Sequence, residues 1–197
     1  MEKIKITAIT GSLGKDSLNR QLAVEAGRII AELSAEQVPT EFCLLDYSDV
    51  PFMNQDIEHP APEPVRRVRG IIKSSDGIWF FSPEYNHSYP GVLKNLIDWL
   101  SRPISESEGQ VLKGKPAAVS GITPGMSGTG IAQDHLVTLI SLLNMKVMNQ
   151  PRLTIPYALQ QTDQNGKLAL NTSAPLLRKQ AEAFLLFIRN SGKLTGI

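Results

Sequence analysis

The sequence has a single cysteine, no long hydrophobic run and almost no excess of charge of either sign. One cysteine, Cys43, excludes a disulfide framework and a cysteine-ligated cluster, and we expect it to pack as a small apolar side chain in a strand. No apolar run approaches the roughly 20 residues of a membrane span. A formal net charge of +1 leaves no basic footprint for nucleic acid. We therefore expect neither a membrane protein nor a nucleic-acid-binding protein.

The composition favours one cytoplasmic domain. The chain has 197 residues, 42% of them hydrophobic, which is enough for a substantial core without disulfides or structural metals. Met1-Glu2-Lys3-Ile4 leads directly into a strand pattern, with no apolar core of a signal peptide. We expect residues 1–197 to form a single domain.

Short apolar runs alternate with segments whose apolar residues recur at helical spacing. Strands are predicted at 5–10, 42–45, 77–81, 116–120 and 145–148. Helices are predicted at 18–33, 64–74, 90–101, 129–143 and 176–188. This alternation predicts an α/β fold with a five-stranded parallel sheet of order 2-1-3-4-5 and helices on both faces.

Three loops rich in small and polar residues follow the first, third and fourth predicted strands, at 11–19, 82–88 and 121–129. In such sheets, ligands bind outside the carboxyl ends of the strands where the strand order reverses. We therefore expect these loops to lie at one edge of the sheet and to form the binding site.

The first loop suits a phosphate group. A helix start favours an anion, Ser12, Ser17 and Asn19 add side-chain donors, and Lys15 adds charge. The alternative for Ser17 is that it only caps the helix. The P-loop pattern Gly-x-x-x-x-Gly-Lys-Ser/Thr and the dinucleotide pattern Gly-x-Gly-x-x-Gly are both absent, so Asp46 is expected to be a solvated loop residue and not a ribose ligand.

The second loop, 83–88, suits a flat hydrogen-bonding ring such as a flavin. Prolines near both ends favour a fixed backbone, so that backbone groups of Glu84, Tyr85 and Asn86 could meet the ring edge. An unpaired carboxylate against a ring would be costly, so the backbone of Glu84 is expected to matter more than its side chain. The third loop is dense in glycine, which lets backbone approach a flat ligand closely. These features favour a flavin-dependent reductase.

A serine hydrolase is the competing interpretation. Ser127 lies between a predicted strand and a predicted helix, but Thr129 stands where a nucleophile elbow needs glycine, and His135 lies in the same helix. His59, His87 and His135 show no metal-ligand spacing, so no metal site is expected.

Two segments carry a family resemblance: Gly11-Ser12-Leu13 with Ser17-Leu18-Asn19, and the stretch 83–102 that begins Pro83-Glu84-Tyr85-Asn86-His87-Ser88. In both, the chain resembles the NADPH-dependent FMN reductases, and within them the bacterial quinone and chromate reductases. The resemblance extends over nearly the whole chain, and the second motif is the more specific of the two.

The resemblance implies a flavodoxin-like three-layer sandwich, one FMN per subunit, and a homodimer or homotetramer with sites near the subunit interface. It implies that NADPH or NADH reduces FMN and that quinones, chromate or azo compounds accept the electrons in a ping-pong reaction. The cofactor-binding residues that it implies are Ser12, Ser17, Leu18 and Asn19 for the phosphate, Pro83, Glu84, Tyr85 and Asn86 for the ring, and Ile122 and Thr123 for the ring's other side. Because the flavin carries the chemistry, no catalytic side chain is assigned. A flavodoxin-type electron carrier would share the fold, but such carriers are strongly acidic, unlike this chain.

Two departures from the family pattern affect these expectations. Family members usually carry arginine where this chain has Gly14, so we expect weaker FMN binding, with Lys15 substituting in part. Close relatives carry arginine near Ile131 and glutamate near Arg152, in a network linked to tetramer contacts.

Overall fold

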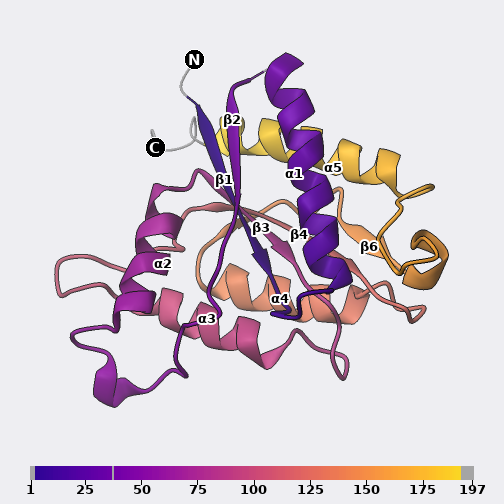
Figure 1. Ribbon diagram of the computed structural model, residues 1–197. Coiled ribbons are helices and arrows are strands. Elements are labelled where there is room, and N and C mark those ends of the chain that lie inside the picture. Colours follow the sequence, from indigo (N-terminus) through magenta and orange to yellow (C-terminus); the bar gives the residue numbers. More distant parts are fainter. Residues whose placement is uncertain (1–2, 37, 192–197) are drawn as a thin grey trace.

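A parallel sheet of order β2-β1-β3-β4-β5, with β6 also beside β4, runs through the centre of the molecule (Figure 1). The computed structural model describes residues 3–36 and 38–191. Its strands are β1 (Ile4–Thr10), β2 (Thr40–Leu44), β3 (Gly77–Phe81), β4 (Pro116–Ile122), β5 (Lys146–Val147) and β6 (Leu153–Ile155). Every strand pair is parallel. The predicted strand order and flavodoxin-like fold are confirmed.

The connecting helices are α1 (Leu18–Glu36), α2 (Glu63–Ser74), α3 (Gly91–Ser101), α4 (Gly130–Leu142) and α5 (Ala174–Ser191). All of the predicted helices are present, although some of their ends are shifted by a few residues. Pro62 and Pro90 directly precede α2 and α3, where a missing N–H costs no helical hydrogen bond. None of the helices in the described ranges is both long and apolar enough to cross a bilayer.

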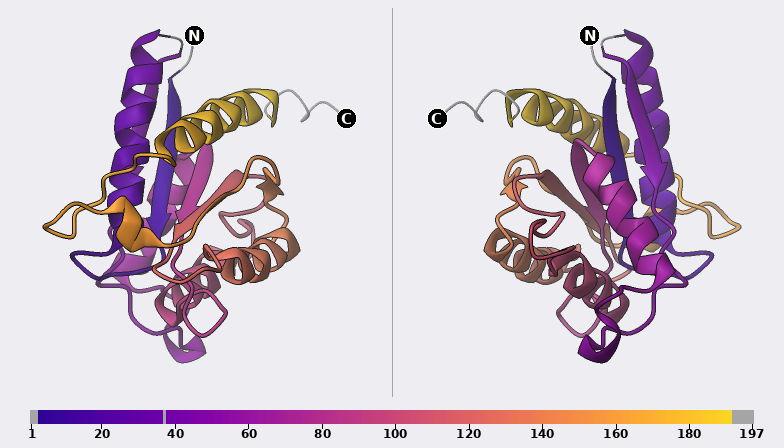
Figure 2. Two further views of the ribbon diagram at one scale, coloured as in Figure 1. Left: turned by 90° about the vertical axis from the view of Figure 1, so that its right-hand side faces the viewer. Right: turned by 90° about the vertical axis from the view of Figure 1, so that its left-hand side faces the viewer.

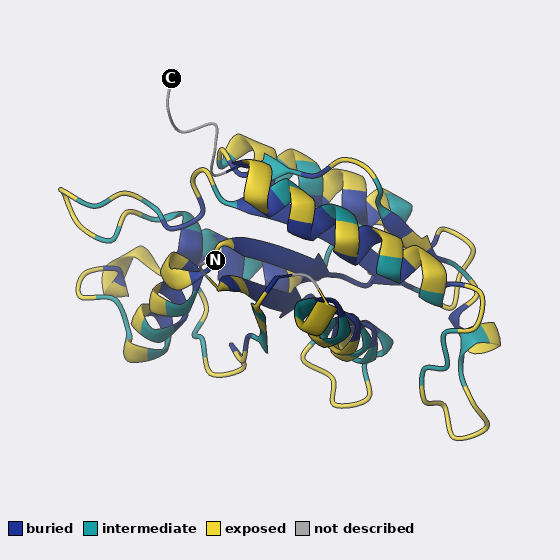
Figure 3. Ribbon diagram, turned by 90° about the horizontal axis from the view of Figure 1, so that it is seen from above, coloured by how far each residue is buried: buried dark blue, intermediate teal, exposed yellow. Residues whose placement is uncertain are grey.

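The helices form two layers that enclose the sheet (Figures 2 and 3). Helices α1 and α5 cover one face, while α2, α3 and α4 cover the other. Successive side chains of a strand point to opposite faces of the sheet, so β3 contributes side chains to both helix layers. Trp79 and Phe81 pack in the core with α1 and α5, and Ile78 and Phe80 pack in the core with α2 and α3. The sheet is therefore buried on both faces.

The fifth predicted strand is only partly correct. We expected one strand at 145–148, but the position beside β4 is filled by two short pieces. Strand β5 pairs with Pro116 and Ala117, whereas β6 pairs with residues 120–122. Pro151 lies between the pieces and has no N–H to donate to the sheet, which explains the interruption. Pairing with β6 also extends β4 to Ile122, so the third loop begins later than expected.

Cys43 and Asp46, which we expected outside the site, have structural positions, and so does Trp99. Cys43 lies in β2 as predicted, half-buried, with Sγ 3.2 Å from the hydroxyl oxygen of Thr7. Trp99 is fully buried and its indole N–H donates to the Pro51 carbonyl at 2.8 Å. The Asp46 carboxylate accepts hydrogen bonds from the Ser48 N–H and hydroxyl, which lower its pKa, and it lies exposed in a loop as expected.

Candidate functional site

Three loops meet at Ser82, at the carboxyl ends of β1, β3 and β4. The buried Ser82 follows β3, and its N–H donates to the Ser120 carbonyl of β4 at 3.0 Å. The Gly11 N–H after β1 donates to the Phe81 carbonyl at 2.8 Å. A Cβ on Gly11 would lie 2.7 Å from Ser82 Oγ, and a Cβ on Gly121 would lie 2.5 Å from the Ser82 carbonyl oxygen. Only glycine permits this close approach, so the predicted clustering of the loops is built into the backbone.

The loop between β1 and α1, residues 11–17, presents backbone donors that have no protein partner. Across the described parts of the chain, the N–H groups of Ser12, Leu13, Lys15 and Asp16 donate to no protein acceptor. Helix α1 begins directly after this loop, and its dipole adds positive potential. Free N–H groups at a helix start are the arrangement that binds phosphate.

The hydroxyl oxygens of Ser12 and Ser17 accept hydrogen bonds from backbone N–H groups, and their O–H groups are still able to donate. Ser17 Oγ accepts from the Arg20 N–H at 3.4 Å, so Ser17 does cap α1. Ser12 Oγ accepts from the Gly14 N–H at 3.3 Å. Both contacts use the hydroxyl oxygen as acceptor, so each O–H is still available to a phosphate. The cap is thus established, and the phosphate role of both serines stays a prediction.

Tyr47 supports the root of this loop, a role that the sequence pattern did not suggest. Its side chain is buried, and its hydroxyl donates to the Thr10 carbonyl at 2.5 Å. Burial raises the pKa of Tyr47 well above its ordinary value, so the phenol stays protonated and keeps donating.

Asn19 and Ile122 are arranged differently from the expected direct contacts. The Asn19 side chain is buried; its Nδ2 donates to the Ile122 carbonyl at 2.9 Å, and its Oδ1 accepts from the Ile122 N–H at 3.1 Å. Its amide group therefore joins α1 to β4 and is not free for a phosphate, so that a phosphate contact would have to use the Asn19 backbone N–H. Ile122 is almost fully buried in the core, and its backbone is paired with Asn19. Asn19 thereby fixes the first loop relative to the third.

Gly14 lies in open space. A Cβ added there would have Ser12 Oγ at 3.4 Å and Ser17 Cβ at 4.0 Å as its nearest neighbours, which is ordinary van der Waals contact. Among the described glycines, the positive φ angles belong to Gly114, Gly128 and Gly166. The backbone therefore does not require glycine at position 14.

The second loop closes on itself in a tight turn. The Tyr85 N–H donates to the Ser88 carbonyl at 2.8 Å, and the Ser88 N–H donates back at 3.0 Å. Asn86 and His87 between them have φ angles of 50° and 60°, the left-handed conformation that non-glycine residues adopt at a cost. Because the backbone groups of Tyr85 are used in this turn, the N–H groups without an acceptor in the described part of the chain are those of Glu84, Asn86 and His87.

The Glu84 side chain has a structural role that we did not predict. Its Oε2 accepts from the Ala132 N–H at 3.1 Å, in the first turn of α4, and its Oε1 lies 3.4 Å from His87 Nδ1. The side chain is only 7% exposed. A helix N-terminus stabilises a carboxylate, so the start of α4 is the partner that makes burial of this side chain possible. Glu84 thereby ties the second loop to the element that follows the third loop.

Each of the three loops also exposes one large apolar side chain. Leu13 is 45% exposed, Tyr85 53% and Met126 79%. Thr123, at the start of the third loop, has its N–H paired with the Ile155 carbonyl at 3.0 Å, so β6 supports the base of this loop. An apolar rim around backbone donors is chemically suited to a flat, partly apolar ring that carries a phosphate.

Residues 4–160 match the sequence model of the NADPH-dependent FMN reductase family. The chain is 35% identical over 187 residues to a 2-hydroxy-1,4-benzoquinone reductase from a Burkholderia species, a match that spans 95% of this chain and 97% of the relative. It is 36% identical over 190 residues to an NAD(P)H-dependent FMN reductase from Pseudomonas aeruginosa, with 95% and 97% covered. The chain belongs to the NADPH-dependent FMN reductase family.

A solved structure agrees with this assignment. The flavoenzyme NAD(P)H:(acceptor) oxidoreductase FerB from Paracoccus denitrificans superposes with a TM-score of 0.83 at 34% identity, covering 95% of this chain and 98% of FerB. FMN reductase chemistry needs a phosphate cradle and a ring site. The residues present fit both groups, since free N–H groups occur in the first loop and again in the second loop beside the apolar rim.

The serine hydrolase interpretation is wrong for this FMN reductase. Ser127 Oγ accepts from the Thr129 N–H at 3.4 Å, and His135 Nδ1 lies 3.4 Å from Ser88 Oγ. No contact between Ser127 and a histidine occurs in the described residues, so a nucleophile and base are not paired there.

Arg152, one of the family departures, forms an ion pair with Asp134 at 2.5 Å within the chain.

Proposed function

We propose that this FMN reductase transfers two electrons from NADPH or NADH to quinones and to related acceptors such as chromate and azo compounds. The observation that carries the proposal is the convergence at Ser82 of three loops with free N–H groups and exposed apolar side chains. The names of the similar proteins support a quinone as the acceptor class.

The first loop would hold the phosphate of FMN. The Ser12 N–H and the hydroxyls of Ser12 and Ser17 would donate to its oxygens, the Lys15 ammonium would balance its charge, and the N–H groups of Leu18 and Asn19 would complete the cradle. Lys15 is exposed, so its contribution should be screened by salt.

The second and third loops would hold the ring. Pro83 would flank it, the N–H groups of Glu84 and Asn86 would meet its polar edge, and Tyr85 would contribute its side chain. Thr123 would border the opposite side. Ile122 would position this site through Asn19 without contacting the ring.

When bound, FMN supplies the two-electron chemistry, in which NAD(P)H and a proton reduce a quinone to its hydroquinone. The protein orients the reactants. Leu13, Tyr85 and Met126 are exposed beside the proposed ring site, and the nicotinamide and the acceptor would occupy one open face of the ring in turn. Such alternation is a ping-pong reaction, and no side chain is required as acid or base.

The purified protein tests this proposal directly. A yellow protein that oxidises NADPH with benzoquinone, with parallel lines in double-reciprocal plots, is the expected result. A yellow protein inert toward NADPH would indicate an electron carrier instead. A colourless protein that ignores added FMN would reject the proposal. Chromate and an azo dye, assayed in the same way, define the acceptor range.

We also propose that the enzyme works in the cytoplasm as a homodimer or homotetramer of one domain per chain. Both core clusters use the same sheet, which supports one domain. The exposed apolar rim beside the site supports a subunit contact there. Sedimentation of the FMN-loaded protein measures the oligomeric state.

A further inference from the structure

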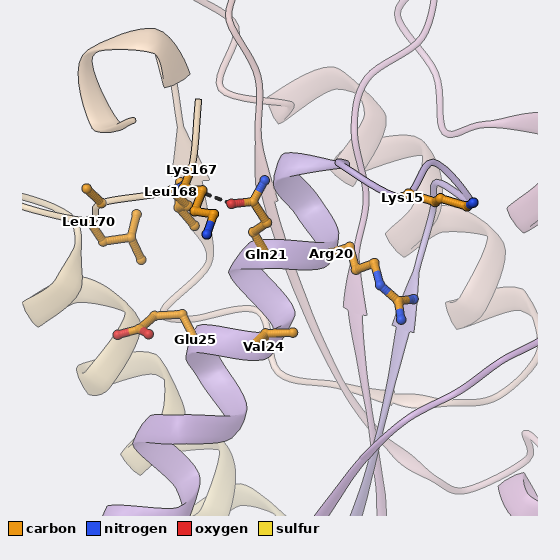
Figure 4. A pocket seen from close by; sticks show the side chains of 9 residues that line it. Lys15, Arg20, Gln21, Val24, Glu25, Lys167, Leu168 and Leu170 are labelled. Atoms are coloured by element: carbon orange, nitrogen blue, oxygen red, sulfur yellow. Dashed lines mark hydrogen bonds between the residues drawn. The ribbon is translucent and has the colours of Figure 1, made fainter. Parts of the chain in front are cut away.

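A groove outside the proposed flavin site runs along the first turns of α1 (Figure 4). It has a volume of about 420 Å³. One wall is α1 with the end of the preceding loop, and the other is the segment 167–170. Figure 2 shows this segment, in orange, running beside the start of α1 on its way to α5.

The second wall is fixed to the first by one side chain. Gln21 Oε1 accepts from the Leu168 N–H at 2.8 Å, and Gln21 Nε2 donates to the Asp16 carbonyl at 3.2 Å. These bonds hold the segment 167–170 against the start of α1, so the groove is a built feature of the fold. This segment lies beyond residues 4–160, which match the family model.

The groove is cationic. It is lined by Lys15, Arg20 and Lys167, none of which forms an ion pair with another described residue. Its one carboxylate, Glu25, is already paired with Arg28 at 2.7 Å. The groove therefore offers three cations without an ion pair among the described residues, the chemistry that attracts phosphate.

The floor of the groove is apolar. Val24 projects from α1 and is 61% exposed, and Leu168 and Leu170 line the opposite wall. In Figure 4, Arg20 and Lys15 lie to one side of Val24, whereas Lys167 and Leu170 lie to the other. A ligand that combines a flat apolar base with more than one phosphate would satisfy both the floor and the flanking charges.

The groove is continuous with the proposed phosphate cradle, because Lys15 belongs to both. A nucleotide bound with its nicotinamide at the ring site and its other half in this groove would pass beside the FMN phosphate. We propose that this groove binds the adenosine 2′-phosphate half of NADPH and makes NADPH the preferred reductant over NADH. The inference rests on the proposed function, because the adenosine half in this groove belongs to the NADPH whose nicotinamide would reduce FMN.

A binding measurement tests the groove without turnover. Adenosine 2′,5′-bisphosphate is titrated into the FMN-loaded protein by calorimetry, with adenosine 5′-monophosphate as the comparison. The bisphosphate should bind about tenfold tighter, because an additional phosphate meets the flanking cations. Equal affinity for the two nucleotides would overturn the inference.

Two neutralising variants locate the contact. Arg20→Gln and Lys167→Gln should each weaken bisphosphate binding by about three- to fivefold, as expected for exposed ion pairs. They should lower kcat/KM for NADPH by a similar factor and leave kcat/KM for NADH unchanged. Lys113→Gln is the matched control, since this exposed lysine precedes β4 at the opposite end of the sheet. Unchanged NADPH kinetics in both groove variants would reject the assignment.

A third variant addresses the apolar floor. Val24→Glu keeps a helix-compatible residue at an exposed position, so the fold should persist, but it places a carboxylate beneath the base and beside the phosphates. Bisphosphate affinity should fall at least about tenfold. Unchanged affinity would contradict binding in this groove.

The two levels of proposal fail in different ways. A protein that binds no FMN contradicts the proposed function. A protein that binds FMN and oxidises NADH and NADPH equally well, in the native form and in Arg20→Gln, contradicts only the groove.

Discussion

The first and second loops of the proposed flavin site are built on opposite principles. The first loop is largely exposed, leaves four of its N–H groups without an acceptor among the described residues and has no residue with positive φ. The second loop closes its own hydrogen bonds, holds Asn86 and His87 in the left-handed region, and is tied to α4 by a buried carboxylate. An open loop can adapt to a phosphate, which accepts bonds from many directions. A ring edge accepts bonds in fixed directions, so the second loop must be held in one shape. Substitutions should therefore be tolerated in the first loop and felt strongly in the second.

Removing the Glu84 carboxylate, which holds the second loop against α4, should have the largest effect on FMN affinity. Glu84→Ala leaves the Ala132 N–H without its acceptor and frees the second loop from α4. A hydrogen bond to a charged group contributes about 1.5–3 kcal/mol, so FMN affinity should fall about ten- to a hundredfold if the tie shapes the ring site. FMN fluorescence titration measures this change. Glu84→Gln is the control, because it keeps an acceptor oxygen and should lose less. Native affinity in the alanine variant would show that the tie does not shape the site.

Adding a donor to the first loop should have the next largest effect. Gly14→Arg is sterically permitted, because a Cβ there meets nothing closer than 3.4 Å. The guanidinium should tighten FMN binding by about tenfold through a charge-assisted bond to phosphate. Gly14→Gln has similar bulk without the charge and should change affinity little. Weaker binding in the arginine variant would mean that the loop needs an unhindered backbone after all.

Ser17 allows the cap and the phosphate contact to be separated. Ser17→Ala removes the cap of α1 and should lower the free energy of unfolding by about 1 kcal/mol, in addition to weakening FMN binding. Ser17→Asp caps as well as serine does, so its stability should stay near native, but its charge should repel the phosphate. Denaturant unfolding of the apoprotein and FMN titration distinguish the two roles. Equal FMN affinity in the native protein and the aspartate variant would remove Ser17 from the cradle.

Relieving the strained turn should have the smallest effect. His87→Gly accepts a φ of 60° without steric cost, whereas His87→Ala keeps the cost, and both variants lose the contact with Glu84. The glycine variant should therefore be more stable than the alanine variant by about 0.5–1 kcal/mol, as measured by chemical unfolding. The opposite order would show that position 87 is not held in the left-handed region.

The sequence was sufficient to predict the arrangement of the fold. Strand β3 is apolar on both sides because both faces of the sheet are covered, and this continuous apolar run allowed the parallel α/β architecture to be predicted. Strand β5 was harder to predict, because the break at Pro151 and the return of the chain as β6 depend on tertiary pairing with β4.

The site was predictable to the level of its loops but not of its side-chain contacts. Polar residues after strands one, three and four identify the loops. The amide of Asn19 could equally have faced a phosphate, and only the position of Ile122 across the sheet gives it another partner. The partner of the Glu84 carboxylate could not be identified from the sequence, because this backbone N–H of α4 lies 48 residues further along the chain. Contacts of this kind depend on how distant elements pack, which local sequence patterns do not encode.

A crystal structure of the protein grown with FMN is the most direct test of where the coenzyme lies. Electron density for the phosphate should lie against the N–H groups of residues 12–19, and density for the ring should lie between Glu84–Asn86 and Thr123. Well-ordered density at another surface, or none in this crevice at saturating FMN, would contradict the assignment of the site.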